Sequence, residues 1–185
     1  MISVGVIGCG HWGPNHIRIF SQLADSRVLM GADLDSMRLS SIQALFPKIQ
    51  VTKDYKDVLN NSAIDAVVVA LPTNLHFKIT REALQAGKHV LCEKPLAMRA
   101  EECLQLGDLA KSAGKILMAG HVFVFNQGIV KLREYIASGE MGKIHYAHSQ
   151  RTNLGPFRYD VNALWDLAPH DISIFNFLFN SAISY

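Results

Sequence analysis

Cysteine is scarce in this chain, and no apolar stretch approaches the length of a membrane span. The three cysteines, Cys9, Cys92 and Cys103, are odd in number and form no C-x-x-C pair, which argues against a disulfide framework or a zinc site. The apolar start of the chain has no basic segment and ends early in a glycine turn, so it predicts a core strand rather than a signal peptide. We therefore expect a cytoplasmic protein without a bound metal.

The chain also lacks a basic block. Its 18 lysine and arginine residues and 16 aspartate and glutamate residues are scattered and leave a formal net charge of +2. Nothing in this pattern favours nucleic acid or a membrane surface as a partner. The composition, 49% hydrophobic and 18% charged, is typical of a globular protein, and 185 residues suit one domain or one domain and part of another.

Short apolar runs alternate with longer helix-like segments along most of the chain. Strands are predicted at residues 2–7, 28–32, 49–51, 66–70, 89–92 and 116–119, and helices at 14–23, 36–46, 54–59, 75–86 and 100–112. This alternation predicts an α/β fold with a Rossmann-type doubly wound parallel sheet over residues 1–119. Residues 120–185 follow a different pattern, with helices expected at 128–137 and 164–179 and a partly polar strand at 143–152.

A glycine-rich run, Gly8-Cys9-Gly10-His11-Trp12-Gly13, joins the first predicted strand to the first predicted helix. In this context Gly8 permits a tight turn, Gly10 lets the backbone approach a pyrophosphate, and Gly13 lets the helix pack closely on the strand. The N–H groups at the start of the helix then face the phosphate charge. A glycine-rich turn without a ligand is the alternative interpretation.

Asp33 follows the second predicted strand, where a carboxylate accepts hydrogen bonds from the adenosine ribose of a dinucleotide. Its charge repels a 2′-phosphate, so NAD is favoured as the cofactor, while the nearby Arg38 leaves NADP open. Alternatively, Asp33 only caps the helix that follows. A methyltransferase would use the same combination of glycine loop and acid.

Glu93-Lys94-Pro95 follows the fifth predicted strand, at the edge of the sheet where ligands bind in such folds. Lys94 can donate to a substrate hydroxyl and stabilise negative charge on its oxygen. Pro95 restricts Lys94 to extended backbone and can hold a cis bond, and Glu93 can pair with Lys94 or contact the cofactor. A solvated charged turn is the alternative. The run 71–76 follows the fourth predicted strand at the same edge, where it is either a ligand-binding loop or a plain turn before a helix.

Asp166 and His170 are four residues apart, and on a helix this spacing places two side chains on one face. Histidine titrates near neutral pH and suits the removal of a proton from an alcohol, and Asp166 can orient it. Because Pro169 is tolerated only in the first turn of a helix, the helix is expected to begin near Ala168. A capping aspartate and a buried histidine are the alternative interpretation.

The chain resembles the glucose–fructose oxidoreductase/inositol dehydrogenase family (Gfo/Idh/MocA). The matching stretches are residues 4–10, 71–76, 86–96 and 165–171. The glycine loop alone is generic, but the long stretch around Glu93-Lys94-Pro95, followed by Asp-x-x-x-His, is specific. The resemblance implies a Rossmann domain followed by an α/β domain with a large open sheet, often used to form homo-oligomers. Residues 120–185 would then be the incomplete start of this second, substrate-binding domain.

The resemblance also implies an activity. It makes the chain an NAD(P)-dependent oxidoreductase acting on a secondary hydroxyl of a sugar, polyol or nucleotide-linked sugar, with Lys94, Asp166 and His170 as catalytic residues. The expected cofactor-binding residues are Gly8, Gly10, His11, Trp12, Gly13, Asp33, Leu71, Pro72, Asn74, His76, Glu93 and Lys94. The expected substrate-binding residues are Lys94, Asn126, Arg151, Asn153 and His170. The stretch 151–156, together with 162–166, is similar to members that act on nucleotide-linked sugars. A truncated, non-catalytic NAD-binding module is the alternative function.

Overall fold

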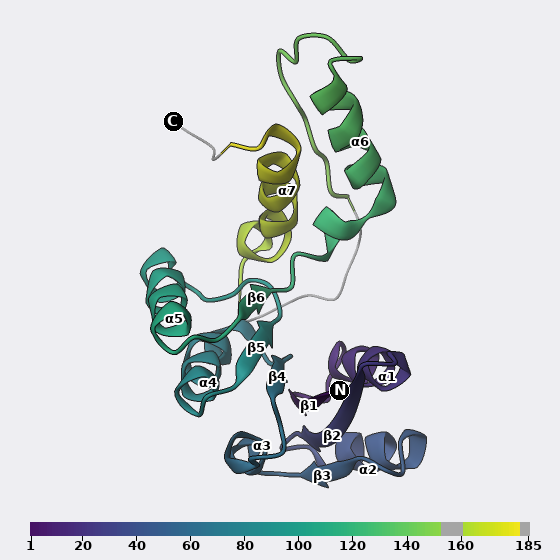
Figure 1. Ribbon diagram of the computed structural model, residues 1–185, viewed down its shortest axis with the longest axis vertical. Coiled ribbons are helices and arrows are strands. Elements are labelled where there is room, and N and C mark those ends of the chain that lie inside the picture. The colour runs from purple at the N-terminus through teal and green to yellow at the C-terminus, as the bar shows by residue number, and fades with distance from the viewer. Residues whose placement is uncertain (153–160, 182–185) are drawn as a thin grey trace. The chain divides into compact units, whose positions relative to one another are not determined.

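Six short apolar segments form one parallel sheet in the order β3-β2-β1-β4-β5-β6 (Figure 1). The computed structural model describes residues 1–152 and 161–181, and it divides into two units, Met1–Gly120 and His121–Tyr185. The strands of the first unit are β1 (Ile2–Ile7), β2 (Ser26–Ala32), β3 (Gln50–Thr52), β4 (Ala66–Val69), β5 (His89–Cys92) and β6 (Leu117–Ala119). Its helices are α1 (Gly13–Gln22), α2 (Ser36–Leu45), α3 (Tyr55–Asn60), α4 (Thr73–Gln85) and α5 (Ala100–Ser112). The predicted doubly wound sheet is confirmed.

Each face of the sheet is covered by its own helices (Figure 1). On one face, Val68 of β4 belongs to a buried cluster with Ile17 of α1 and Ile42 of α2. The opposite face carries a second cluster, which includes Val67 of β4 and buried residues from the other three helices: Val58 of α3, Ile79 of α4 and Leu106 of α5. A strand buried on both faces must be apolar throughout, which explains the unbroken Ala-Val-Val-Val sequence of β4.

All six strands end at the same level of the sheet. Their paired terminal residues, in the order of the sheet, are Thr52, Ala32, Ile7, Val69, Cys92 and Ala119. The segments that follow the strands therefore leave along one edge. The sheet reverses its strand order between β1 and β4, and the loops at such a point diverge and leave a crevice that dinucleotides occupy in doubly wound folds.

Lys88, just before β5, is buried, which is an uncommon environment for a lysine. Its Nζ donates to the carbonyl oxygens of Asn61 and Ile64, each at 2.7 Å. These two bonds tie the segment after α3 to the start of β5. Burial lowers the pKa of Lys88, and the two carbonyl acceptors compensate the ammonium group for part of its lost hydration.

We expect Lys88→Met to lower the free energy of unfolding by about 2–3 kcal/mol, because a buried and a partly buried carbonyl oxygen lose a charged donor. Urea denaturation followed by circular dichroism measures the change. The exposed Lys53 is the matched control, and Lys53→Met should alter stability by less than about 0.5 kcal/mol. Equal losses in the two variants would mean that the Nζ bonds of Lys88 contribute nothing specific.

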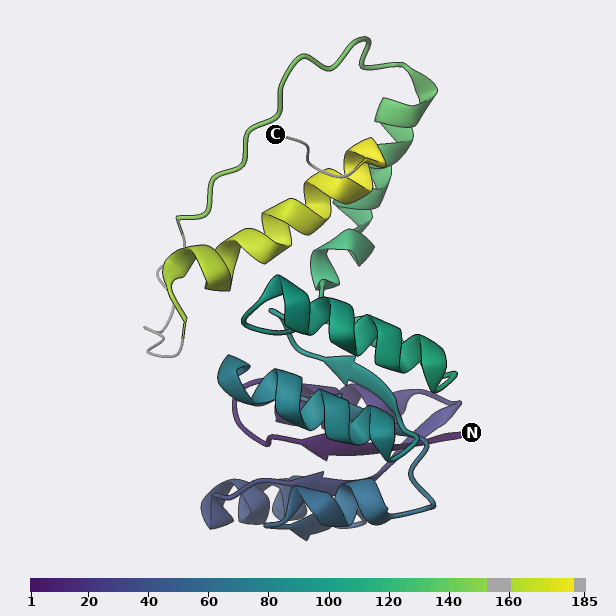
Figure 2. The same cartoon turned by 90° about the vertical axis from the view of Figure 1, so that its left-hand side faces the viewer.

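The second unit contains a short 3-10 helix, η1 (Val122–Phe125), and two longer helices, α6 (Gln127–Ser138) and α7 (Ala163–Phe179). Asn126 caps α6 by accepting hydrogen bonds from the N–H groups of Gly128 and Ile129, and Gly139 ends the helix in the left-handed conformation. Helices α6 and α7 pack side by side (Figure 2). None of the helices in the described part of the chain has the length and apolar character needed to cross a bilayer.

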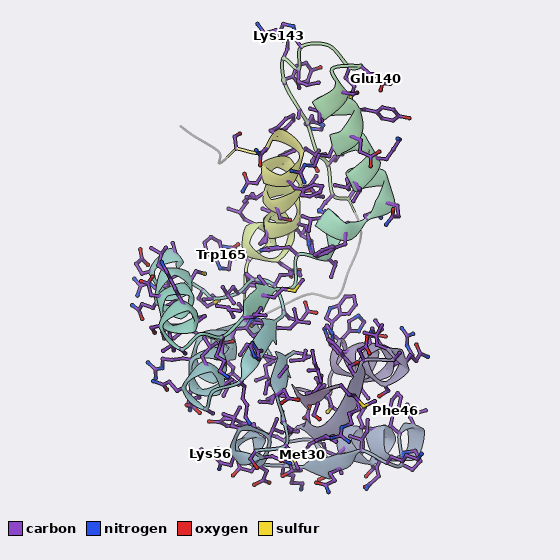
Figure 3. All side chains as sticks on the ribbon, viewed as in Figure 1. Met30, Phe46, Lys56, Glu140, Lys143 and Trp165 are labelled. Carbon is purple, nitrogen blue, oxygen red and sulfur yellow. The ribbon has the colours of Figure 1, made fainter. Side chains whose placement is uncertain are left out.

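Two local predictions for this unit are wrong. The segment 143–152 is not a strand; it continues as irregular chain from Lys143, which Figure 3 places at the turn after α6. A strand requires a hydrogen-bonded neighbour, and no described segment of the unit pairs with these residues.

The start of α7 is the second error. The helix begins at Ala163, not near Ala168, so Pro169 lies inside it. Asn162 provides the earlier start, because its side chain accepts a hydrogen bond from the N–H of Trp165 at 2.9 Å. The proline costs about 3 kcal/mol in a helix interior, and packing of the long apolar helix has to offset it.

Candidate active site

The glycine loop is as tight as its sequence predicts. Gly8 has a φ of 98°, and its N–H donates to the carbonyl of Ala32 at 2.8 Å, which fixes the start of the loop on β2. Gly13 lies so close to the carbonyl of Gly8 that a side chain at this position would overlap it. The loop therefore packs directly against the first turn of α1, and the contact between them is made by backbone atoms rather than side chains.

The start of α1 is suited to an anion. Its N-cap residue, Trp12, makes no side-chain capping bond, whereas α2 and α3 are capped by Asp35 and Asp54. An uncapped helix start leaves N–H groups available to a phosphate. The rings of His11 and Trp12 are exposed at this loop and contact each other edge to face, with centroids 5.2 Å apart.

Asp33 lies directly after β2 and is fixed by the backbone. Its two carboxylate oxygens accept the N–H groups of Cys9, at 2.7 Å, and Asp35, at 2.9 Å. Oδ1 keeps a lone pair for one hydroxyl group of a ribose. Oδ2 also accepts Nη1 of Arg38 at 3.5 Å, a long contact that a second hydroxyl group would have to replace. Asp35, not Asp33, caps α2, so the helix-cap interpretation of Asp33 is wrong. The Arg38 guanidinium lies 3.5 Å from Asp33 and is half exposed.

The backbone N–H of Cys9 binds this carboxylate, while its buried thiol contacts the carbonyl oxygen of Ala32. Burial and the charge of Asp33 raise the pKa of Cys9 to about 12, so the side chain remains a neutral thiol within the core. The second residue of the glycine loop therefore adds no charge near the start of α1.

Glu93, Lys94 and Pro95 form the turn after β5, and we refer to residues 93–95 as the Lys94 turn. The Lys94–Pro95 peptide is cis. Glu93 Oε1 lies 2.8 Å from Nε2 of His16 on α1, and Glu93 Oε2 accepts the backbone N–H of Lys94 at 3.3 Å. Burial raises the pKa of Glu93, but its interaction with His16, together with the smaller contributions of the Lys94 N–H and His76, outweighs burial and brings the pKa below its usual value. Glu93 is therefore a carboxylate at neutral pH.

The sequence did not single out His16. It lies on α1, 77 residues before Glu93, and no local motif connects the two. Only the sheet, which places β1 and its following helix near the ends of β4 and β5, brings the pair together.

The loop after β4 separates into exposed and buried residues. Pro72 and Asn74 are exposed, and Leu71 is half-buried, so these residues are accessible to a ligand. The side chain of His76 is buried, with its two ring nitrogens 2.8 Å from the carbonyl oxygen of Leu71 and 2.7 Å from that of Pro95. His76 therefore joins two loops of the site through their backbone, and its role as a direct cofactor ligand stays a prediction.

The second unit carries the other part of the expected catalytic set. Asp166 and His170 both lie on α7, where a separation of four residues places them on one face. The His170 ring contacts the ring of Phe123 in η1 edge to face, with centroids 4.8 Å apart. The contact fixes the histidine ring against the start of the unit.

Arg151 is also held on α7. Its Nε donates to Asp171 at 2.8 Å, and its guanidinium lies 4.6 Å from the centre of the Phe123 ring. Burial raises the pKa of Asp171, but hydrogen bonds from Arg151 and Ser149 outweigh it and lower the pKa. The anchoring of Arg151 explains its position without a substrate, so substrate binding by Arg151 stays a prediction.

The remaining expected substrate residues are Asn126 and Asn153. The side-chain oxygen of Asn126 is engaged in capping α6. Asn153 lies outside the described residues.

Comparison with known proteins gives a consistent family. Residues 2–121 match the Gfo/Idh/MocA model, described as an oxidoreductase family with an NAD-binding Rossmann fold. Inositol 2-dehydrogenase 2 of Saccharopolyspora erythraea is 31% identical over 186 residues, which cover 98% of this chain and 55% of that protein.

Solved structures agree. Myo-inositol 2-dehydrogenase from Lactobacillus plantarum matches with a TM-score of 0.72 and 26% identity, over 77% of this chain and 43% of that one. KijD10, a 3-ketoreductase from Actinomadura kijaniata solved with NADP and TDP-benzene, matches with a TM-score of 0.70 and 29% identity, over 75% of this chain and 42% of that one.

This chain spans about half the length of these relatives. The family match runs from β1 to the end of β6 and includes the glycine loop, Asp33 and the Lys94 turn. It excludes the methyltransferase alternative. The chain belongs to the Gfo/Idh/MocA family of oxidoreductases with an NAD-binding Rossmann fold.

Proposed function

We propose that the chain binds NAD(H). We further propose that the protein to which it belongs transfers a hydride between the cofactor and a secondary hydroxyl of a sugar, polyol or nucleotide-linked sugar. The observation that carries the proposal is the geometry of Asp33. Its carboxylate is held by two backbone N–H groups at the edge where the glycine loop also lies. Oδ1 keeps a lone pair for a ribose hydroxyl, and a second hydroxyl would take the place of the long Arg38 contact at Oδ2. The close packing of backbone at Gly8 and Gly13 holds the loop against the start of α1, whose uncapped N–H groups suit a pyrophosphate.

NAD is preferred to NADP in this proposal. The fixed carboxylate of Asp33 repels a 2′-phosphate, and Arg38 is paired with Asp33 and Asp35. One of the relatives was solved with NADP, so the family accommodates both cofactors. In this chain the choice between NAD and NADP depends on whether the repulsion of a 2′-phosphate by Asp33 exceeds its attraction to Arg38.

The chemistry is assigned to three residues by family resemblance. The bound nicotinamide supplies the hydride acceptor. His170 removes the hydroxyl proton, Lys94 stabilises the charge that develops on the oxygen, and Asp166 orients His170 or relays its proton. The relatives include inositol dehydrogenases and a reductase solved with a TDP ligand, so polyols and nucleotide-linked sugars are the substrate classes to test.

A fluorescence titration with NADH and with NADPH tests the proposal. The wild-type chain should prefer NADH, and Asp33→Ser should shift the ratio of the two dissociation constants towards NADPH by about 10-fold or more, since a repelling charge is removed and Arg38 is released. Asp108→Ser, at an exposed position of α5, makes the same change of charge away from the loop and should leave the ratio unchanged.

A folded chain that binds neither nucleotide would refute the cofactor assignment. A wild-type preference for NADPH, or an unchanged ratio in Asp33→Ser, would refute the role of Asp33. Binding of NADH without oxidation of any polyol or nucleotide-linked sugar would favour the non-catalytic module for this chain.

A further inference from the structure

Two histidines contact the Lys94 turn, and they come from different helices. His16 of α1 reaches the side chain of Glu93, and His76 of α4 reaches the carbonyl oxygen of Pro95. The two contacts hold the first and the last residue of the turn, and Lys94 lies between them.

His76 is almost wholly enclosed, with 1% of its surface exposed. Its Nδ1 faces the carbonyl of Pro95 and its Nε2 faces the carbonyl of Leu71, at 2.7 and 2.8 Å. A carbonyl oxygen only accepts, so a hydrogen bond between the ring and either carbonyl is donated by the ring nitrogen.

His16 acts on the same turn through a carboxylate. The Glu93 side chain is 12% exposed, and its two oxygens contact His16 and the backbone N–H of Lys94. Gly120, after β6, leaves the space that Glu93 occupies, because a side chain there would come within 3.1 Å of Glu93 Oε2. The position of Glu93 is therefore set by His16 on one side and by the end of β6 on the other.

We propose that His16 and His76 are positioning residues that brace the Lys94 turn and so shape the nicotinamide half of the site without touching a ligand. His16 acts through the carboxylate of Glu93, and His76 acts through the backbone of Pro95. His16 also links the turn to α1, the helix whose start is proposed to face the pyrophosphate. The identity of the ligand rests on the proposed function, whereas the brace itself is a property of the folded first unit.

Three variants and one control separate positioning from general stability. His16→Leu and His76→Phe remove the bonds, and His16→Gln keeps an N–H donor for Glu93. His89→Phe is the control: His89 Nδ1 accepts the N–H of Ile116 at 3.0 Å, at the opposite end of β5. It removes a histidine hydrogen bond from the same strand but leaves the Lys94 turn untouched.

The first measurement needs no ligand. Hydrogen–deuterium exchange of a peptide covering residues 91–98 should be about 10-fold faster in His16→Leu and His76→Phe than in wild type, which corresponds to the loss of one hydrogen bond. It should be unchanged in His89→Phe and close to wild type in His16→Gln. Wild-type exchange in both bond-removing variants would overturn the brace.

The second measurement compares NADH with ADP-ribose, which lacks the nicotinamide. The two bond-removing variants should weaken NADH by about 5- to 10-fold while ADP-ribose binds as in wild type, and His16→Gln should recover most of the loss. Equal weakening of both ligands would overturn the assignment to the nicotinamide half, as would a wild-type chain that binds both equally well. If the wild type binds neither ligand, the proposed function fails, and the exchange experiment still decides whether the brace exists.

Discussion

Gly13→Ala is expected to weaken NADH binding by about 100-fold or more, equivalent to about 2.7 kcal/mol. The added methyl group would overlap the carbonyl oxygen of Gly8 and lie 2.9 Å from its carbon. Neither neighbour is a flexible side chain, so the glycine loop and the start of α1 must move apart. This displaces the N–H groups that are proposed to face the pyrophosphate, and each charge-assisted bond lost costs about 1.5–3 kcal/mol.

Stability should fall as well, by about 1–3 kcal/mol, because overpacking a buried backbone contact forces local rearrangement. Gly107→Ala is the matched control. Gly107 lies within α5, and a methyl group there meets no atom within 4 Å. This control should stabilise the chain by about 0.5–1 kcal/mol and leave NADH binding intact.

Binding by titration calorimetry and unfolding by urea test the pair. If Gly13→Ala bound NADH as wild type does, the close approach of loop and helix would have no role in cofactor binding. If both glycine variants lost stability, the loss would not be specific to the loop.

The first unit was predictable because its physical constraints are local. A strand covered on both faces must be apolar over its full length, so the β4 run 66–69 is recognisable without any knowledge of its neighbours. Glycines and prolines mark where these runs end, and parallel strands place the following loops at one edge. The order of residues alone therefore suffices to assign Asp33 and the Lys94 turn to one edge of the sheet.

The errors and omissions arise where the cause is distant in sequence. The pairing of His16 with Glu93 depends on the folded sheet, and the burial of His76 depends on two carbonyl groups whose positions no motif specifies. The segment 143–152 has the alternation of a strand but no described neighbour to pair with. At α7 the proline does not mark the start of the helix. Asn162 caps the helix six residues before Ala168, and the packing of a long apolar helix offsets the cost of the proline inside it.

Lys94→Met is expected to lower turnover by at least about 100-fold on any polyol or nucleotide-linked sugar that the protein oxidises, which is the usual effect of removing one donor to a developing oxyanion. Methionine keeps the length and apolar stem of lysine but donates no hydrogen bond. The backbone of the Lys94 turn, braced through Glu93 and Pro95, is unchanged. We therefore expect the NADH dissociation constant to rise no more than about fivefold.

Lys94→Arg distinguishes charge from geometry. A guanidinium keeps the positive charge but presents a wider planar group, so turnover should stay well below wild type if a single ammonium donor must be placed on the reacting oxygen. Lys78→Met, at an exposed position of α4, is the matched control and should leave turnover unchanged. Normal turnover in Lys94→Met would remove Lys94 from the catalytic set, while loss of NADH binding together with turnover would make it a cofactor-binding residue. Turnover lost with NADH binding retained would place its contribution in the chemical step, where an ammonium group beyond the end of β5 can act on the substrate oxygen.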